Sequence, residues 1–185
     1  MPWIKEIDVN DAEGKLKEYY EELVKNRGKV SNILKIQSLN PDSMKEHLDL
    51  YMSIMFSKSG LKRDEREMIA VVVSSLNVCE YCINHHAEAL NHYWKDDEKI
   101  QKLIKDFRHL DLSGKQKTML EYSEKLTLTP SEVNEEDISN LREVGFTDEN
   151  ILNINLIVSY FNFVNRIALG LGVEFNEEEM KGYKY

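Results

Sequence analysis

The chain has 185 residues, of which 42% are hydrophobic and 31% are charged, and its formal net charge is −9 at pH 7. This length allows a sizeable buried core and is most simply one domain over residues 1–185. The acidic balance argues against nucleic-acid binding, which needs a basic face, and against binding to an anionic membrane surface.

Apolar residues recur mostly at helical spacing, and only 3 prolines and 8 glycines interrupt the chain. We therefore predict an all-α fold with roughly seven to nine helices, without internal repeats or low-complexity linkers. The first three predicted helices run from about Leu16 to Gly28, from Ser31 to Leu39, and from Met44 to Met55.

Residues 62–78 begin with charged side chains and end in a β-branched, strongly apolar run. Such a run also suits a strand, but the charged residues make a good first helical turn and no partner strands are predicted elsewhere. We therefore expect a buried helix. The remaining predicted helices are Cys79–Tyr93, Asp97–Phe107, Ser113–Leu126, Asn134–Val144 and Thr147 to about Leu171, with a loop at Pro130.

The last predicted helix contains the longest apolar run, Ile151–Gly172, which four asparagines and one arginine interrupt. It is too polar for a membrane span and suits either a core helix or a subunit interface. The first residues of the chain lack the apolar segment of a secretory signal, so a cytoplasmic location is the default expectation.

Both cysteines of the chain, Cys79 and Cys82, lie three residues apart at the start of a predicted helix. The first turn of a helix carries unpaired N–H groups and the positive end of the helix dipole, which favour a thiolate. A second cysteine one turn away can close a disulfide, which is sufficient for a reversible two-electron cycle. In a cytosolic protein such a pair is more often catalytic or metal-binding than a structural crosslink.

A histidine follows the cysteine pair on the same helical face. His86 lies four residues after Cys82 and can take its proton, so Cys82 is the better placed nucleophile and Cys79 its resolving partner. His85 flanks that face and has either a supporting or a packing role. Tyr81, between the cysteines, either hydrogen-bonds into the site or packs, and we favour packing.

A carboxylate is expected to orient the histidine, and Glu67 at the start of the preceding helix is a candidate. In one straight helix, Glu67 would stand about 28 Å from His86. A break at Ser74–Asn77, where Ser and Asn compete for backbone hydrogen bonds, would instead fold the two helices back antiparallel. A proton relay therefore predicts a helix–turn–helix over about residues 62–93, the core of the redox motif.

Two other interpretations of the cysteines remain open. The two thiolates and one histidine would give three zinc ligands with an open fourth position, although no second ligand pair is present in the sequence. The thiols are otherwise simply buried. The lone histidines His47, His92 and His109 are expected to be ordinary surface or core residues.

The spacing of these residues resembles that of alkylhydroperoxidase D and its relatives in the carboxymuconolactone decarboxylase-like superfamily. Those proteins carry a glutamate, eleven residues, C-x-x-C, three residues and a histidine. Here Glu67 precedes Cys79-Glu80-Tyr81-Cys82 by eleven residues, and His86 follows after three more. The segment "YFNFVNRIALGLGVE" resembles the peroxidase-related branch of that superfamily.

The resemblance implies an alkylhydroperoxidase D-like helical bundle, usually a homo-oligomer, that reduces hydroperoxides without a metal or organic cofactor. It implies that Cys82 attacks the peroxide, that Cys79 resolves it, and that His86 and Glu67 relay protons. An external dithiol or lipoyl-type reductant would restore the thiols. A thiol–disulfide oxidoreductase with another substrate and a zinc-binding structural module are the alternatives.

This chain departs from alkylhydroperoxidase D in one respect. That protein has a histidine immediately before the second cysteine, where this chain has Tyr81. A phenol titrates near 10 and does not shuttle protons at neutral pH as an imidazole does. Decarboxylase members of the superfamily lack the cysteine pair, so decarboxylation is not expected.

Overall fold

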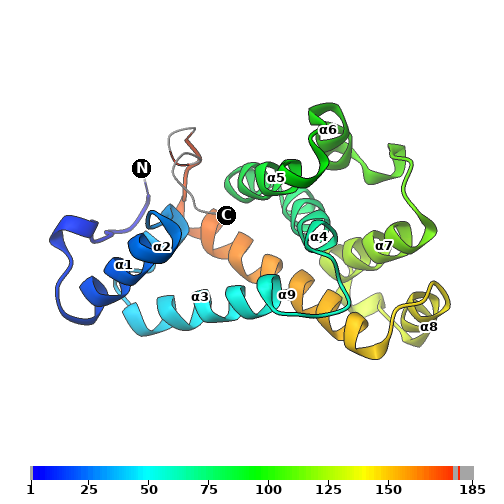
Figure 1. The fold of residues 1–185 in the computed structure, drawn as a ribbon, viewed down its shortest axis with the longest axis horizontal. Helices are drawn as coiled ribbons and strands as arrows, with labels where there is room; N and C mark the ends of the chain where they lie inside the picture. The colour runs from blue at the N-terminus through cyan, green and yellow to red at the C-terminus, as the bar shows by residue number, and fades with distance from the viewer. Residues whose placement is uncertain (1, 177–178, 180–185) are drawn as a thin grey trace. The chain divides into compact units, whose positions relative to one another are not determined.

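The computed structural model describes residues 2–176 and 179, and over these residues the fold is all-α, as predicted, with no strand. The α-helices are α1 Gly14–Arg27, α2 Asn32–Lys35, α3 Pro41–Phe56, α4 Arg63–Leu76, α5 Glu80–Trp94, α6 Asp97–Lys105, α7 Gly114–Leu128, α8 Glu135–Glu143 and α9 Asp148–Leu171 (Figure 1). Short 3₁₀ turns lie at Val9–Asp11, Phe107–His109 and Pro130–Glu132.

The chain forms two compact units. One unit combines the residues up to Ser53 with those from Arg166 onward, and the other is Ile54–Asn165. Helices α3 and α9 each run through a boundary between units. All four residues predicted to carry the chemistry lie in the second unit, whereas the single domain over residues 1–185 stays a prediction.

Helix α4 is the centre of the second unit and packs against α5, α6 and α7 (Figure 1). Every residue from Arg66 to Ser74 is buried, including the β-branched run Val71–Val73. A helix that is apolar nearly all round is stable only when other elements cover it on several sides. The prediction of a buried helix here, rather than a strand, is therefore confirmed.

A tight turn reverses the chain between α4 and α5. Helix α4 ends at Leu76, Asn77 caps it, and the backbone N–H of Cys79 donates to the Ser74 carbonyl at 3.0 Å. Val78 has a φ of 56°, and the residue is 76% exposed. The left-handed region is costly for a β-branched residue, so the turn is a strained connection held by its surroundings.

Helix α2 is shorter than the predicted helix over Ser31–Leu39. After Ile36 the backbone bonds reach only three residues back: the N–H of Gln37 donates to the Leu34 carbonyl and that of Ser38 to the Lys35 carbonyl. These are turn-type bonds, so the helix does not continue although the apolar spacing does.

Helix α9 has a core side and an exposed side. Ile154, Ile157, Val158 and Phe161 are fully buried, whereas Leu152, Leu156 and Phe163 are 39–57% exposed. Within the described residues, α9 is the helix long and apolar enough to cross a membrane, a test that core helices also pass. The buried side of α9 thus has a core role within the single chain, and a subunit interface on its exposed side stays a prediction.

Candidate active site

The fold-back of α5 on α4 brings Glu67 and His86 into contact. The Nδ1 atom of His86 lies 2.7 Å from Oε2 of Glu67, and the Glu67 side chain is fully buried. A carboxylate at this distance accepts the Nδ1–H hydrogen, which leaves Nε2 as the acceptor of a neutral imidazole. The sequence prediction that a turn, and not one straight helix, joins these residues is confirmed.

Arg63 holds the other oxygen of the same carboxylate. Its Nη2 atom lies 2.6 Å from Oε1 of Glu67, and its guanidinium stacks on the Phe56 ring at 4.1 Å. The buried carboxylate therefore sits between a cation and an imidazole, which compensates the cost of its burial. The sequence analysis missed Arg63, although its position four residues before Glu67 on a helix was an available signal.

The two cysteines face one another as free thiols. Their sulfur atoms lie 2.7 Å apart, and their residues are 1% and 3% exposed for Cys79 and Cys82, respectively. Cys79 is the N-cap of α5, and Cys82 lies in its first turn. The pair is thus positioned to close a disulfide with little backbone movement. In the isolated chain, both cysteines are almost inaccessible to water.

The two thiols differ in acidity. The hydrogen bond from the Cys82 side chain lowers the pKa of Cys79, against the effect of burial, and the Cys82 backbone N–H lowers it further. The same sulfur–sulfur contact, burial and the Cys79 charge raise the pKa of Cys82. The first proton of the pair therefore leaves a charge on Cys79, the residue at the helix N-terminus.

His86 packs against α9 and is not hydrogen-bonded to the sulfurs among the described residues. Its ring packs edge-on against Phe161, with ring centroids 4.5 Å apart. Within the described part of the chain, His86 makes no hydrogen bond to Cys79 or Cys82. A proton transfer between the histidine and a thiol would therefore need a bridging water or substrate, which is common in sites that lack bound substrate.

Tyr81 and His85 pack on each other, with ring centroids 4.5 Å apart, and Tyr81 is buried. The choice between a packing and a hydrogen-bonding role for Tyr81 stays a prediction. Over residues 2–176 and 179, no cluster of three or more His, Cys, Asp or Glu side chains is arranged to hold a metal ion.

A buried asparagine from α9 completes the surroundings of the cysteines, and the sequence analysis did not identify it. Asn165 is fully buried, and it hydrogen-bonds Ser74 and Asn77 of the α4–α5 turn. The signal was present in the polar interruptions of the long apolar run, but the partner of each asparagine depends on tertiary packing.

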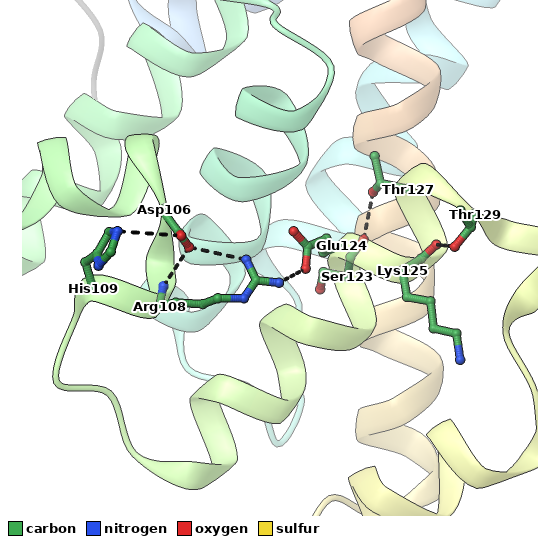
Figure 2. A network of polar contacts seen from close by, with 8 residues as sticks. All are labelled: Asp106, Arg108, His109, Ser123, Glu124, Lys125, Thr127 and Thr129. Atoms are coloured by element: carbon green, nitrogen blue, oxygen red, sulfur yellow. Dashed lines mark hydrogen bonds and ion pairs between the residues drawn. The ribbon is translucent and has the colours of Figure 1, made fainter.

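A cavity of about 240 Å³ lies elsewhere in this unit. Its apolar wall comes from α4 and α6, and its polar rim includes Asp106, Arg108 and Glu124. Figure 2 shows Arg108 between Asp106 and Glu124, to both of which it is paired. None of Glu67, Cys79, Cys82 or His86 lines this cavity.

The chain was compared with known proteins. The model of the carboxymuconolactone decarboxylase family matches residues 41–106, which include α3 to α6 and all four predicted site residues. A crystal structure of an uncharacterized peroxidase-related protein from Ralstonia eutropha JMP134, with an alkylhydroperoxidase AhpD core, is 28% identical with a TM-score of 0.87, covering 97% of this chain and 94% of that chain.

Two further structures are similar over most of their length. An uncharacterized peroxidase-related protein from Silicibacter sp. TM1040 is 31% identical with a TM-score of 0.84, covering 96% of this chain and 95% of that chain. The debrominase Bmp8 in complex with 2,3,4-tribromopyrrole is 18% identical with a TM-score of 0.79, covering 95% and 92%. This last likeness shows the fold alone.

Proposed function

Because the chain belongs to the alkylhydroperoxidase D-like, carboxymuconolactone decarboxylase superfamily, we propose that it is a thiol-dependent peroxidase whose dithiol is Cys79 and Cys82. The observation that carries the proposal is the pair of free sulfurs 2.7 Å apart at a helix N-terminus. Two thiols at this separation, one of them acidified by its neighbour, are suited to a two-electron cycle.

The proposed cycle starts from a thiolate shared by the two sulfurs. The charge rests mainly on Cys79, and passage of the Cys82 proton to Cys79 makes Cys82 the nucleophile that the superfamily resemblance implies. The Cys82 thiolate attacks a hydroperoxide, the O–O bond breaks, and the products are a sulfenic acid and an alkoxide. The alkoxide takes a proton delivered through His86 and leaves as an alcohol.

The second half of the cycle restores the thiols. Cys79 loses its proton and attacks the Cys82 sulfenic acid, which forms the disulfide and releases water. An external dithiol or lipoyl-type reductant then returns both cysteines to thiols by thiol–disulfide exchange. Glu67 contributes by holding His86 in one orientation and one tautomer. We propose a cytoplasmic homo-oligomer for this activity.

The test uses hydroperoxide consumption with dithiothreitol as reductant. Because the chain has only two cysteines, Cys82→Ser, Cys79→Ser and the double variant separate the two sulfurs. We expect wild type to turn over, Cys79→Ser to stop at a sulfenic acid that dimedone traps, and Cys82→Ser to form none. Sulfenic acid found only in Cys82→Ser would reverse the assignment of the nucleophile. Equal consumption by wild type and the double variant would exclude the dithiol from the reaction.

The acidity of Cys79 favours one alternative, a thiol–disulfide oxidoreductase. In such enzymes the cysteine nearest the helix N-terminus attacks a disulfide, and here that thiol has the lowered pKa. The rates of oxidation separate the two activities. A peroxidase site is oxidised by hydroperoxide much faster than free dithiothreitol is, whereas an oxidoreductase site reacts with hydroperoxide no faster than a free thiol.

A further inference from the structure

Asn165 is a fully buried polar side chain, and it is held by two hydrogen bonds within its own unit. The Asn77 amide donates to Oδ1 of Asn165 at 3.1 Å, and Nδ2 of Asn165 donates to the Ser74 hydroxyl at 3.2 Å. An unpaired amide at this depth would be costly, so these bonds fix its orientation.

Both partners of Asn165 belong to the turn that carries the cysteines. The Ser74 carbonyl accepts the backbone N–H of Cys79, and the Asn77 amide also donates to the Val73 carbonyl at 3.1 Å. Asn165 therefore binds the last turn of α4 at the point where the strained Val78 connection leads into α5. A change in this contact would move Cys79 relative to the rest of the unit.

The amide of Asn165 also acts on the second sulfur. It lies close enough to Cys82 to lower the pKa of that thiol, against the larger raising effects of the Cys79 contact, burial and the Cys79 charge. Among the described residues, one N–H of the amide binds Ser74 and no other oxygen accepts the second N–H. That second N–H is the donor available to the sulfur.

We propose that Asn165 is a positioning residue for the dithiol, which anchors the α4–α5 turn through Ser74 and Asn77 and donates its side-chain amide to the Cys82 thiolate. Within the cycle, charge moves from Cys79 to Cys82 before the attack. A neutral donor beside Cys82 stabilises that charge without adding a competing base. The role in the cycle depends on the proposed peroxidase function, but the effect on thiol acidity does not.

The test measures the ionisation of Cys82 alone. In a Cys79→Ser background, the rate of iodoacetamide alkylation as a function of pH gives the midpoint at which Cys82 ionises. We expect Asn165→Ala and Asn165→Asp to raise that midpoint by about one pH unit, because a hydrogen bond to a charged group is lost. The carboxylate of Asn165→Asp retains the shape of the side chain and adds like-charge repulsion.

Asn162 provides a matched control on the same helix. It accepts from the same Asn77 amide at 3.1 Å, and its own amide donates to Thr127 on α7 at 3.1 Å. Figure 2 shows Thr127, whose hydroxyl donates to the backbone carbonyl of Ser123 on α7. Asn162→Ala removes part of this polar network, and Asn162 is not among the groups that shift the pKa of Cys82, so the Cys82 midpoint of this variant should remain that of the background protein.

Two outcomes would overturn the proposal. One is an unchanged Cys82 midpoint in both Asn165 variants; the other is an equal shift in Asn162→Ala. If the Asn165 variants do not fold, the side-chain amide of Asn165 is followed by NMR in the Cys79→Ser protein as Cys82 titrates. The proposal requires the Asn165 Nδ2 proton signals to follow that titration, and an insensitive signal contradicts it. Since no peroxide is used, failure here is distinct from failure of the proposed peroxidase function.

Discussion

The buried contact of Glu67 with His86 makes Glu67→Gln an informative change. Glutamine has nearly the same shape but replaces one carboxylate oxygen with an NH₂ group and removes the charge. Both oxygens of Glu67 face donors, Arg63 Nη2 at 2.6 Å and His86 Nδ1 at 2.7 Å. Whichever way the new amide turns, its NH₂ group meets another N–H donor, so one of the two contacts is lost.

The size of the effect follows from the kind of bond that is lost. A hydrogen bond to a charged group contributes about 1.5–3 kcal/mol. If the contact with His86 is the one lost, and its whole free energy stabilises the transition state, the rate of hydroperoxide consumption should fall by roughly 10- to 150-fold. The same loss should lower the melting temperature by several degrees, at about 2–4 °C for each kcal/mol in a chain of this size.

The assay follows disulfide formation at pH 7 after mixing reduced protein with hydroperoxide, with rapid quenching and mass spectrometry. Glu88→Gln is the matched control, because Glu88 is an exposed residue two positions after His86 on α5. We expect this control to react at the wild-type rate. A Glu67→Gln protein that melts earlier but reacts as fast as wild type would show that the buried ion pair is structural and that Glu67 does not assist the chemistry.

Three further predictions concern stability. In the folded dithiol, Cys79 releases its proton below the ordinary thiol pKa of 9.0, so the stability of the reduced protein should rise as pH rises toward 9.0. Above pH 9.0 the unfolded chain has lost both thiol protons while folded Cys82 keeps its own, so the stability should fall. Urea denaturation should show that this alkaline fall disappears in Cys82→Ser. Burial lowers the pKa of His47 to about 4, so the unfolded chain takes this proton first as pH falls below 6.5; about 3 kcal/mol of stability should be lost by pH 4, and His47→Gln should remove much of that loss in the same assay. Val78→Gly should stabilise the protein by about 0.5–1 kcal/mol, because relief of the left-handed strain exceeds the added entropy of the unfolded chain, and a lower urea midpoint would show that Val78 is not strained.

The helical fold was predictable because its signal is local. Apolar spacing identified each long helix, and the charged start of α4 was enough to distinguish a helix from a strand for the Val71–Val73 run. The end of α2 was not predictable in this way. Beyond the helix, the backbone N–H groups of Gln37 and Ser38 donate to carbonyls three residues back instead of four. Nothing in the apolar pattern over Ser31–Leu39 marks that change.

The site was only partly predictable, since its members come from separate helices. The spacing of Glu67 and His86 required a turn for contact, and Ser74–Asn77 was a suitable place for it; the helix in fact continues to Leu76 before it turns. Arg63 was within reach of the same reasoning. Asn165 was not, because it is 91 residues from Ser74 in sequence and only packing brings the two together.

The relative acidity of the thiols illustrates a limit of motif reasoning. From spacing alone, the neighbouring His86 made Cys82 the better nucleophile. The structure adds two facts that spacing does not contain, namely the 2.7 Å contact of the sulfurs and the depth of their burial. In a shared pair, the thiol at the helix N-terminus takes the first charge, and transfer to Cys82 then needs a donor such as Asn165.

Three asparagines of α9 explain how this helix can be as apolar as a membrane span and still be a core element. Asn155 donates to the Tyr122 hydroxyl at 2.8 Å, Asn162 to Thr127 and Asn165 to Ser74, so each amide has a partner on α7 or α4. In lipid these amides would need the same partners, whereas here they bind α7 and α4 of the protein core. Asn165 is therefore part of the packing that holds the α4–α5 turn beside the dithiol, whereas Asn155 and Asn162 join α9 to α7.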